Sequence, residues 1–364
     1  MTKRNATMRD VATRAGVSPA TVSYVLNNRN RVGAAVRQRV LDAMTDLSYY
    51  PSAAARSLVR QRTNLIAFLI PHRPDSVFLD PYFAELMRGV AIMADAHEYN
   101  PVVVTVEGHD HARAVSARLV RNNQVDGIII SYLSDDDAYL LMEMEKATIP
   151  FVIIGSAKER TDAVVDIDNC GGAEQAITHL LGLGHRAIGF INGPGDAPHA
   201  KQRLLGVRGA LLAHDQPLSC CTVVNGGFSR EGAYAAMQQL LTGNSPPTAV
   251  FAASDQMAVG ALHYLHERGV RVPGDVSLVG FDDNVLATAT YPALTTVRQP
   301  IRQLGEMAAD LLFKKIRSLP LPPSIILSTE LIVRDSTGAP PVDIVVGAAP
   351  HAGPVIPALA VEGG

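Results

Sequence analysis

The chain has 364 residues, 47% of them hydrophobic, and a net charge of −3 at neutral pH. A chain of this length and composition can bury large cores in roughly two or three domains. It has no apolar run of about 18 residues and begins with MTKRNATMRD, which argues against a membrane span and a secretory signal and predicts a cytoplasmic protein. Cys170, Cys220 and Cys221 lack metal-ligand spacing, so we expect reduced thiols and no metal.

Charge is distributed unevenly along the chain. Residues 1–62 contain 11 Lys and Arg against 3 Asp and Glu, a net charge of +8, whereas the remaining 302 residues carry 21 against 32, a net charge of −11. A basic segment attached to an acidic body confines the attraction for DNA phosphate to that segment. The candidate phosphate contacts, each of which could instead be an ordinary solvated arginine, are Arg29, Arg31, Arg37, Arg39, Arg56 and Arg60.

The first predicted element is a helix-turn-helix. Thr7 is a predicted N-cap for a helix over 8–15, and Gly16 supplies a left-handed turn. Ser18 is a predicted N-cap for the second helix, with Pro19 in its first turn. The outward face of this helix is small and polar, which suits base edges in a major groove, and consists of Ala20, Ser23, Tyr24 and Asn27. Taken alone, the segment could also be an ordinary helical hairpin.

A third helix is predicted over 34–47, where apolar side chains complete a small core: Val36, Val40, Ala43, Met44 and Leu47. The sequence YYP then stops the helix, and an Ala-rich segment over 52–58 follows. A helix this short is unstable alone in water, but it can form against a twin helix and DNA. Leu58 would then be the wedge that unstacks a base step from the minor groove. The alternative is a plain linker.

From residue 63 onward, apolar strands alternate with helices. This pattern predicts parallel sheets covered on both faces by helices, and its repetition predicts two similar lobes. The predicted strands are 65–70, 101–106, 127–130, 151–154, 164–167, 187–191, 222–224, 249–251 and 276–281. The predicted helices are 81–96, 110–122, 135–147, 203–212, 230–241, 255–267 and 301–317.

Ligands of open α/β sheets bind beyond the carboxyl ends of the strands. Aromatic rings there can stack on a sugar or a base, while Arg and Asp can bind hydroxyl groups or ring nitrogens. The candidate ligand contacts at these positions are Tyr82, Phe83, Arg203, Phe228, Ser254 and Asp282. Simple packing is the alternative for Tyr82. For Asp255 we expect a helix-capping role rather than ligand contact.

Several motifs carry a resemblance to a known family. The segment DVATRAGVSPATVSYVLNN, its spacing to YYPSAAARSL, and the later GPGDAPHAKQRLLGVRGAL and SLVGFDDN resemble the lac repressor/galactose repressor family of bacterial transcriptional regulators over about residues 8–335. The fold class that this resemblance implies is a two-lobed, periplasmic-binding-protein-like α/β body behind an N-terminal all-α helix-turn-helix domain.

The resemblance also implies domain limits. Residues 1–50 would be the DNA-binding domain, 51–62 the hinge helix and linker, and 63–335 the effector-binding and dimerisation domain. Lobe one would comprise 63–167 and 296–324, and lobe two 168–295 and 325–335. The Ala-, Pro- and Gly-rich tail, 336–364, has no leucine heptads, so we expect disorder rather than a coiled coil.

Carried over by position, the family's DNA-binding residues are Ser18, Pro19, Ala20, Thr21, Ser23, Tyr24, Asn27, Arg31, Tyr49, Ala55 and Leu58. The family implies a repressor that binds a pseudo-palindromic operator as a homodimer, with a small effector between the lobes that controls folding of the hinge helix. By position, the family's effector pocket adds His199 to the candidate ligand contacts.

The identity of the effector stays open at this point. Ala197 stands where purine-binding members carry a basic residue, so a purine is not favoured. A sugar or sugar derivative is favoured, and a nucleoside remains possible. Two other classes are weighed: a transport binding protein, which the basic helix-turn-helix disfavours, and an enzyme, for which the sequence offers no GxSxG, HExxH or P-loop motif and no assigned catalytic residue.

Overall fold

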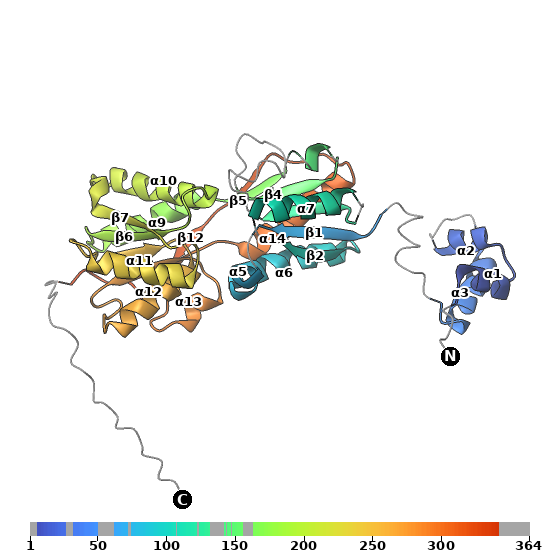
Figure 1. Cartoon of the computed structure of the whole chain (residues 1–364), viewed down its shortest axis with the longest axis horizontal. Helices are drawn as coiled ribbons and strands as arrows, with labels where there is room; N and C mark the ends of the chain where they lie inside the picture. Colours follow the sequence, from blue (N-terminus) through green and yellow to red (C-terminus); the bar gives the residue numbers. More distant parts are fainter. Residues whose placement is uncertain are drawn as a thin grey trace, which may run out of the picture.

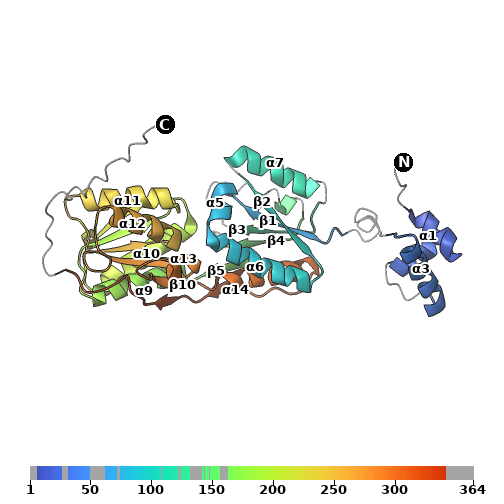
Figure 2. The same cartoon turned by 90° about the horizontal axis from the view of Figure 1, so that it is seen from below.

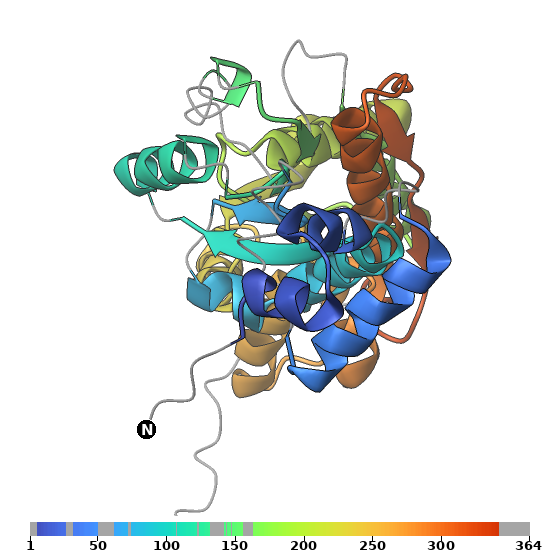
Figure 3. The ribbon, with the colours of Figure 1, turned by 90° about the vertical axis from the view of Figure 1, so that its right-hand side faces the viewer.

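The computed structural model describes residues 6–26, 32–49, 62–71, 74–106, 108–121, 124–131, 142, 144–146, 148–155 and 163–341. The N-terminal domain contains the helices α1 (Met8–Ala15), α2 (Pro19–Leu26) and α3 (Ala34–Asp46), which pack on one another (Figure 3). Their core consists mainly of Val11, Ala12, Val22, Val25 and Val40. The predicted bounds of the first helix and the predicted start of the second are confirmed.

Local hydrogen bonds explain where these helices begin and end. Thr7 and Asp10 form a capping box, in which the Thr7 Oγ1 accepts from the Asp10 amide at 3.4 Å and the Asp10 carboxylate accepts from the Thr7 amide at 2.8 Å. Gly16 ends α1 with φ 64°, a left-handed conformation that favours glycine. The Thr21 amide donates to Ser18 Oγ at 3.1 Å, so Ser18 caps α2 as predicted.

The body consists of two lobes, each with one sheet between two layers of helices (Figure 1). The sheet of lobe one has the order β11-β5-β4-β3-β1-β2, with β1 (Leu65–Ile70), β2 (Asn100–Thr105), β3 (Gly127–Ser131), β4 (Phe151–Ile154), β5 (Val164–Ile167) and β11 (Ile325–Leu327). Its helices are α5 (Pro74–Leu79), α6 (Pro81–Ala96), α7 (Gly108–Arg121) and α14 (Ile301–Ile316).

Lobe two repeats this architecture. Its sheet has the order β12-β10-β9-β8-β6-β7, with β6 (Ile188–Asn192), β7 (Cys221–Asn225), β8 (Ala249–Ala252), β9 (Ser277–Asp282), β10 (Thr295–Arg298) and β12 (Glu330–Ile332). Helices α9 (Asn169–Gly182) and α10 (Pro198–Ala213) cover one face; α11 (Arg230–Thr242) and α12 (Asp255–Glu267) cover the other. The short elements η2 (Leu218–Cys220) and α13 (Val285–Ala289) complete the lobe.

The predicted strands are confirmed, with ends shifted by one residue at most. The described strands pair in parallel, except that β12 runs antiparallel to β10. The pattern does not predict α9, since Gly171 and Gly172 interrupt its helical periodicity. The predicted helix over 135–147 lies largely outside the described residues.

Two of the predicted lobe limits need correction. β10 pairs with β9 of lobe two, and β11 pairs with β5 of lobe one, so both strands belong to the lobe that the chain is about to leave. The second and third crossings between the lobes therefore lie at 299–300 and 328–329, a few residues later than predicted. The reason is sheet hydrogen bonding, which extends each strand to the edge of its lobe.

The predicted start of the tail at Ser336 is also corrected. Ser336 is 1% exposed, its Oγ donates to the Leu278 carbonyl at 2.6 Å, and the Leu278 amide donates to the Ser336 carbonyl at 2.8 Å. The Gly338 amide adds a bond to Ser277 Oγ at 3.0 Å. The folded body thus extends beyond 335, and residues 342–364 lie outside the described part of the chain.

Helices α6 and α14, far apart in sequence, pack side by side in lobe one (Figure 2). Their contact depends on glycine at the crossing. A Cβ on Gly89 would overlap the Arg302 carbonyl oxygen, and one on Gly305 would overlap that of Leu86. The segment after the second crossing is therefore an integral part of the lobe-one core.

None of the described helices has the length and apolar character needed to cross a bilayer. Over the same residues, no group of three or more His, Cys, Asp or Glu side chains is placed to hold a metal ion. The three cysteines are free and half-buried, and burial raises the pKa of the Cys221 thiol to about 12.

Candidate ligand cavity and DNA-reading helix

A cavity of about 160 Å³ lies between the two lobes. Lobe one lines it with Asp80, Tyr82, Phe83, Ser131, Ile154, Gly155, Asp166, Ile167 and Leu304. Lobe two lines it with Asn169, Pro198, His199, Arg203, Gly227, Phe228, Ser229, Ser254 and Asp282, and the second crossing adds Gln299. The structure thus brings all the predicted ligand contacts together around one cavity.

Arg203 is a fixed cation in the lobe-two wall. It lies on α10 and is 5% exposed, and its Nε donates to Asn169 Oδ1 at 2.9 Å. Its Nη1 donates to the Ala253 carbonyl, and its Cζ lies 3.7 Å from the centroid of the Phe281 ring. Burial lowers the pKa of this guanidinium, and the nearby Asp282 carboxylate opposes that shift. These contacts hold the planar group rigidly beside the cavity.

Asp282 is the acidic residue that faces this arginine, at the end of β9. It is 4% exposed, with φ 129°, and its Oδ1 accepts from Gln299 Nε2 at 2.5 Å. Its Oδ2 accepts from the Asp255 amide at 3.4 Å. Burial raises the pKa of Asp282 well above its usual range, the Asp255 carboxylate raises it further, and Arg203 opposes the rise. The carboxyl group lies at the junction of the cavity and the second crossing.

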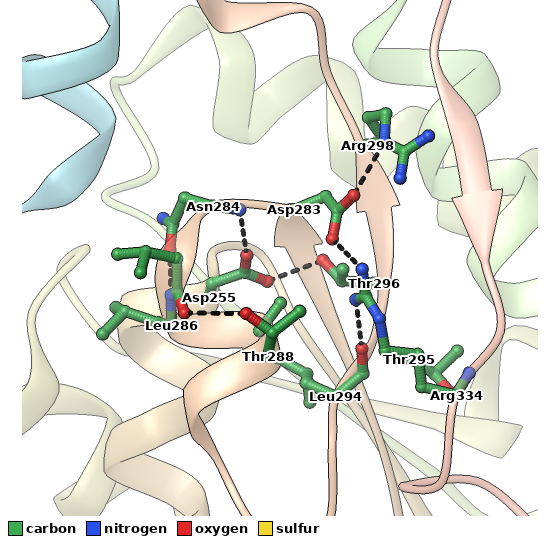
Figure 4. A network of polar contacts seen from close by, with 12 residues as sticks. Asp255, Asp283, Asn284, Leu286, Thr288, Leu294, Thr295, Thr296, Arg298 and Arg334 are labelled. Atoms are coloured by element: carbon green, nitrogen blue, oxygen red, sulfur yellow. Dashed lines mark hydrogen bonds and ion pairs between the residues drawn. The ribbon is translucent and has the colours of Figure 1, made fainter.

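Ser254 and Asp255 lie side by side at the start of α12. Ser254 Oγ accepts from the Met257 amide at 3.1 Å, so Ser254 lines the cavity, as expected for a ligand contact, and also caps α12. Asp255 is fully buried, and it accepts from Thr296 Oγ1 at 2.6 Å and from the Asn284 amide at 3.0 Å (Figure 4). Burial raises its pKa to about 7. The expectation that Asp255 caps the helix is therefore wrong, because its carboxylate joins α12 to β10 and to the loop after β9.

The lobe-one wall is built on the N-terminus of α6. Asp80 caps this helix by accepting from the Tyr82 amide at 3.0 Å. In the first turn that follows, the Tyr82 and Phe83 rings form an edge-to-face pair with centroids 5.3 Å apart. Phe83 is only 8% exposed, so much of its ring packs in the core. Burial raises the pKa of Asp80, and burial together with Asp282 raises that of the Tyr82 hydroxyl.

His199 and Phe228 form the aromatic part of the lobe-two wall, with ring centroids 4.7 Å apart. Phe228 has φ 51°, an uncommon conformation for an aromatic residue. Its ring lies directly over Gly193, where any Cβ would overlap the ring atoms. Gly193, in the loop after β6, thus makes room for the aromatic wall.

The prediction from the sequence misses Asp166 and Asn169. Asp166 Oδ1 accepts from the Ile167 amide at 2.8 Å and from Asn169 Nδ2 at 3.2 Å, and burial raises its pKa to about 6. Asp166 lies near the carboxyl end of a correctly predicted strand, so the rule that found Asp282 could have found it too. Gln299 directly follows β10, but the sequence pattern does not predict that strand, so the rule cannot be applied there.

Helix α2 presents the predicted face as far as the structure describes it. Val22 and Val25 are buried, whereas Pro19 and Ala20 are exposed and Tyr24 is partly exposed. Ser18 Oγ and Thr21 Oγ1 lie 2.9 Å apart at the start of this helix, and Ser23 is also partly exposed.

Among the other predicted DNA contacts, Tyr49 is 9% exposed and packs in the core of the N-terminal domain, and its contact with DNA stays a prediction. The predictions for Asn27, Arg31, Ala55 and Leu58 lie outside the described residues.

A helix-turn-helix domain joined to two lobes with a polar cavity between them defines the class of ligand-responsive DNA-binding regulators. Comparison with known proteins agrees. Residues 7–52 match the model of the bacterial regulatory proteins of the lacI family, and residues 177–337 match that of a periplasmic binding protein-like domain.

Individual relatives cover nearly the whole chain. The HTH-type transcriptional regulator CelR of Thermobifida fusca is 36% identical over 92% of this chain and 99% of its own. A lac repressor dimer bound to operator and the anti-inducer ONPF aligns with TM-score 0.81 and 30% identity over 92% and 100% of the two chains. A CelR–cellobiose complex aligns with TM-score 0.71 and 34% identity over 91% and 99%. The chain belongs to the lacI family of bacterial transcriptional regulators.

Proposed function

We propose that this protein is a repressor that binds a pseudo-palindromic operator as a homodimer, and that a neutral sugar in the inter-lobe cavity sets its DNA affinity. The observation that carries the proposal is the cavity itself, in which Arg203 and Asp282 of lobe two face Asp80, Tyr82 and Asp166 of lobe one. Sugar hydroxyls donate to carboxylates and accept from guanidinium groups, and sugar rings stack on aromatic faces.

The charged residues that line the cavity favour a neutral sugar over a phosphorylated one. The cavity contains the acidic residues Asp80, Asp166 and Asp282 against the single arginine Arg203. A phosphorylated sugar would bring further negative charge into this partly desolvated surrounding, whereas a neutral polyol would not. The relatives support a neutral ligand, since CelR is described in complex with cellobiose.

A ligand that touches both lobes favours the lobe arrangement to which it binds more tightly. In the proposed mechanism, this arrangement controls whether the two hinge segments, residues 51–62, can meet on the operator. Leu58 of each hinge then inserts at the operator centre, while the α2 helices read the half-sites.

The proposal is tested by calorimetric titration of the full-length protein with cellobiose, lactose, glucose and ribose, and with glucose 6-phosphate as the charged partner of glucose. We expect saturable binding of at least one neutral sugar and none of the phosphate. Binding of the phosphate alone, or of none of these sugars, contradicts the proposed ligand class.

Sugar affinity is expected to rise with pH. A sugar hydroxyl that donates to Asp166 stabilises the carboxylate, so binding lowers the Asp166 pKa from about 6 and releases a proton. If the shift on binding is about one pKa unit, affinity increases about fivefold between pH 5 and 7. Titrations at several pH values check this. The matched Asp166→Asn variant, which keeps the Oδ1 acceptor, should show a flatter profile, and an equal slope in both proteins would contradict the assignment.

Operator reading is expected to depend on Tyr24. The Tyr24→Ala variant should lose about tenfold or more in affinity for DNA selected by the protein from a random pool, while affinity for unrelated DNA stays the same. Fluorescence anisotropy measures both. Thr13→Ala, an exposed change on α1 of the same domain, is the control and should leave specific binding within about twofold. Equal losses on both DNAs would show that Tyr24 makes no base-specific contact.

A further inference from the structure

The loop after β9 has two functional faces. Asp282 and Asp283 follow one another with φ 129° and 56°, both positive, so the chain turns sharply and their side chains diverge. Asp282 lines the cavity. The Asp283 carboxylate, 6% exposed, accepts instead from Arg298 Nε at 2.7 Å and from Arg334 Nη2 at 2.5 Å (Figure 4).

Arg298 lies next to the second crossing, and Arg334 lies in the segment that follows the third crossing. Arg298 is the last residue of β10, directly before the second crossing, and Arg334 lies shortly after β12, which the third crossing enters. Arg334 Nη1 also donates to the Leu294 carbonyl at 2.8 Å. The Asp283 clamp, as we call these three residues, consists of Asp283, Arg298 and Arg334. It connects the end of β10 and the residues after β12, which flank the second and third crossings, to the loop after β9.

The two ion pairs of the clamp are not equal. The Arg298 side chain is 50% exposed, whereas that of Arg334 is 18% exposed. Solvent screens an exposed pair strongly and a buried pair weakly. The ion pair between Asp283 and Arg334 is therefore the stronger of the two. The Asp283 carboxylate thus holds the segment that follows the third crossing more firmly than the end of β10, which precedes the second crossing.

The second crossing is held by the other face of the loop. Gln299 donates to Asp282 twice, from its amide to the carbonyl at 3.3 Å and from Nε2 to Oδ1 at 2.5 Å. The Asn284 amide donates to Asp255 at 3.0 Å, which ties the end of the loop to α12. A displacement of Asp282 must consequently move Gln299 on one side and the Asp283 clamp on the other.

We propose that Asp283 is a positioning residue that couples the cavity to the hinge between the lobes, by transmitting displacements of Asp282 to the second and third crossings. The inference deepens the proposed function, on which it rests for the presence of a ligand at Asp282. The conformational link itself is a property of the ligand-free protein. It predicts that the clamp and Asp282 act as one unit on the crossing segments.

The test compares amide hydrogen exchange of the full-length, ligand-free protein with that of Asp283→Asn. Asn tolerates the left-handed conformation as well as Asp does, so this change removes the charge and leaves the turn intact. Peptides covering 296–301 and 330–335 should exchange at least about tenfold faster, while β6 and β8 keep their wild-type rates. Asp275→Asn, which breaks the surface pair of Arg271 and Asp275 in the same lobe, is the control and should change neither crossing.

A purely structural role would produce a different result. Faster exchange spread evenly over lobe two, or no acceleration at the crossings, overturns the proposal. Should Asp283→Asn fold poorly, Arg334→Lys, which keeps the charge but loses the forked geometry, should accelerate 330–335 in the same local way.

The coupling between the cavity and the crossings is measured by amide hydrogen exchange of Asp282→Asn and of the double variant that combines Asp282→Asn with Asp283→Asn. The combined effect on 296–301 should differ from the sum of the single effects, and strict additivity overturns the coupling. Because no ligand is present, these measurements decide the inference independently of the sugar titrations.

Discussion

The Arg203→Ala variant is expected to lose sugar binding by at least about 100-fold, because two charge-assisted hydrogen bonds to a ligand contribute about 3 kcal/mol or more. The protein itself should also become less stable. Arg203 donates to Asn169 and to the Ala253 carbonyl, and it is the cation that opposes the rise in the pKa of the buried Asp282 carboxyl group. Removing one partner of such a buried arrangement costs about 3 kcal/mol. Calorimetric titration and thermal unfolding measure the two effects separately.

Two further variants separate charge from geometry. Arg208→Ala removes an exposed arginine of the same helix and should leave both affinity and stability unchanged. Arg203→Lys keeps the positive charge but lacks the planar, forked set of N–H donors of the guanidinium group. It should therefore recover much of the lost protein stability and little of the lost sugar affinity. An Arg203→Ala protein that still binds the sugar with wild-type affinity would remove Arg203 from the proposed site.

The Gly305→Ala variant is expected to destabilise lobe one by about 2 kcal/mol or more. The new methyl group would overlap the Leu86 carbonyl oxygen, and neither backbone can move without separating α6 from α14. Buried side chains along both helices, including Leu86, Val90, Leu304 and Ala308, would then lose contacts. Urea unfolding monitored by circular dichroism measures the loss.

The matched control is Gly182→Ala. Gly182 is the last residue of α9, and an added Cβ would have no atom within 4 Å. Since alanine has the higher helix propensity, this variant should be neutral or slightly more stable, by up to about 1 kcal/mol. Equal stability of the two variants would mean that the close helix crossing is not a constraint on lobe one.

Local signals in the sequence predict the elements of this protein well. Thr7, Gly16 and Ser18 set the helix-turn-helix through caps and a turn that involve only neighbouring residues. The apolar strands of the body likewise need no partner to be recognised. The predicted site residues also converge, because parallel strands bring their carboxyl ends to one edge of each sheet.

Contacts between distant segments account for what the sequence does not predict. Ser336 looks like the start of an Ala-, Pro- and Gly-rich tail until its bonds to Leu278 and to the Thr295 amide, at 2.8 Å, are known. Asp255 looks like a helix cap until Thr296 and Asn284 are placed beside it. Each depends on tertiary neighbours that no local pattern encodes.

Occupancy of the inter-lobe cavity is expected to change operator affinity. The most direct test measures fluorescence anisotropy of selected operator DNA with the full-length protein, with and without a saturating amount of the neutral sugar identified by calorimetry. We predict a change in operator affinity of at least about fivefold, as expected for an allosteric coupling of 1–3 kcal/mol. The change should be absent in Arg203→Ala. An operator affinity that is identical with and without the bound sugar would contradict the account.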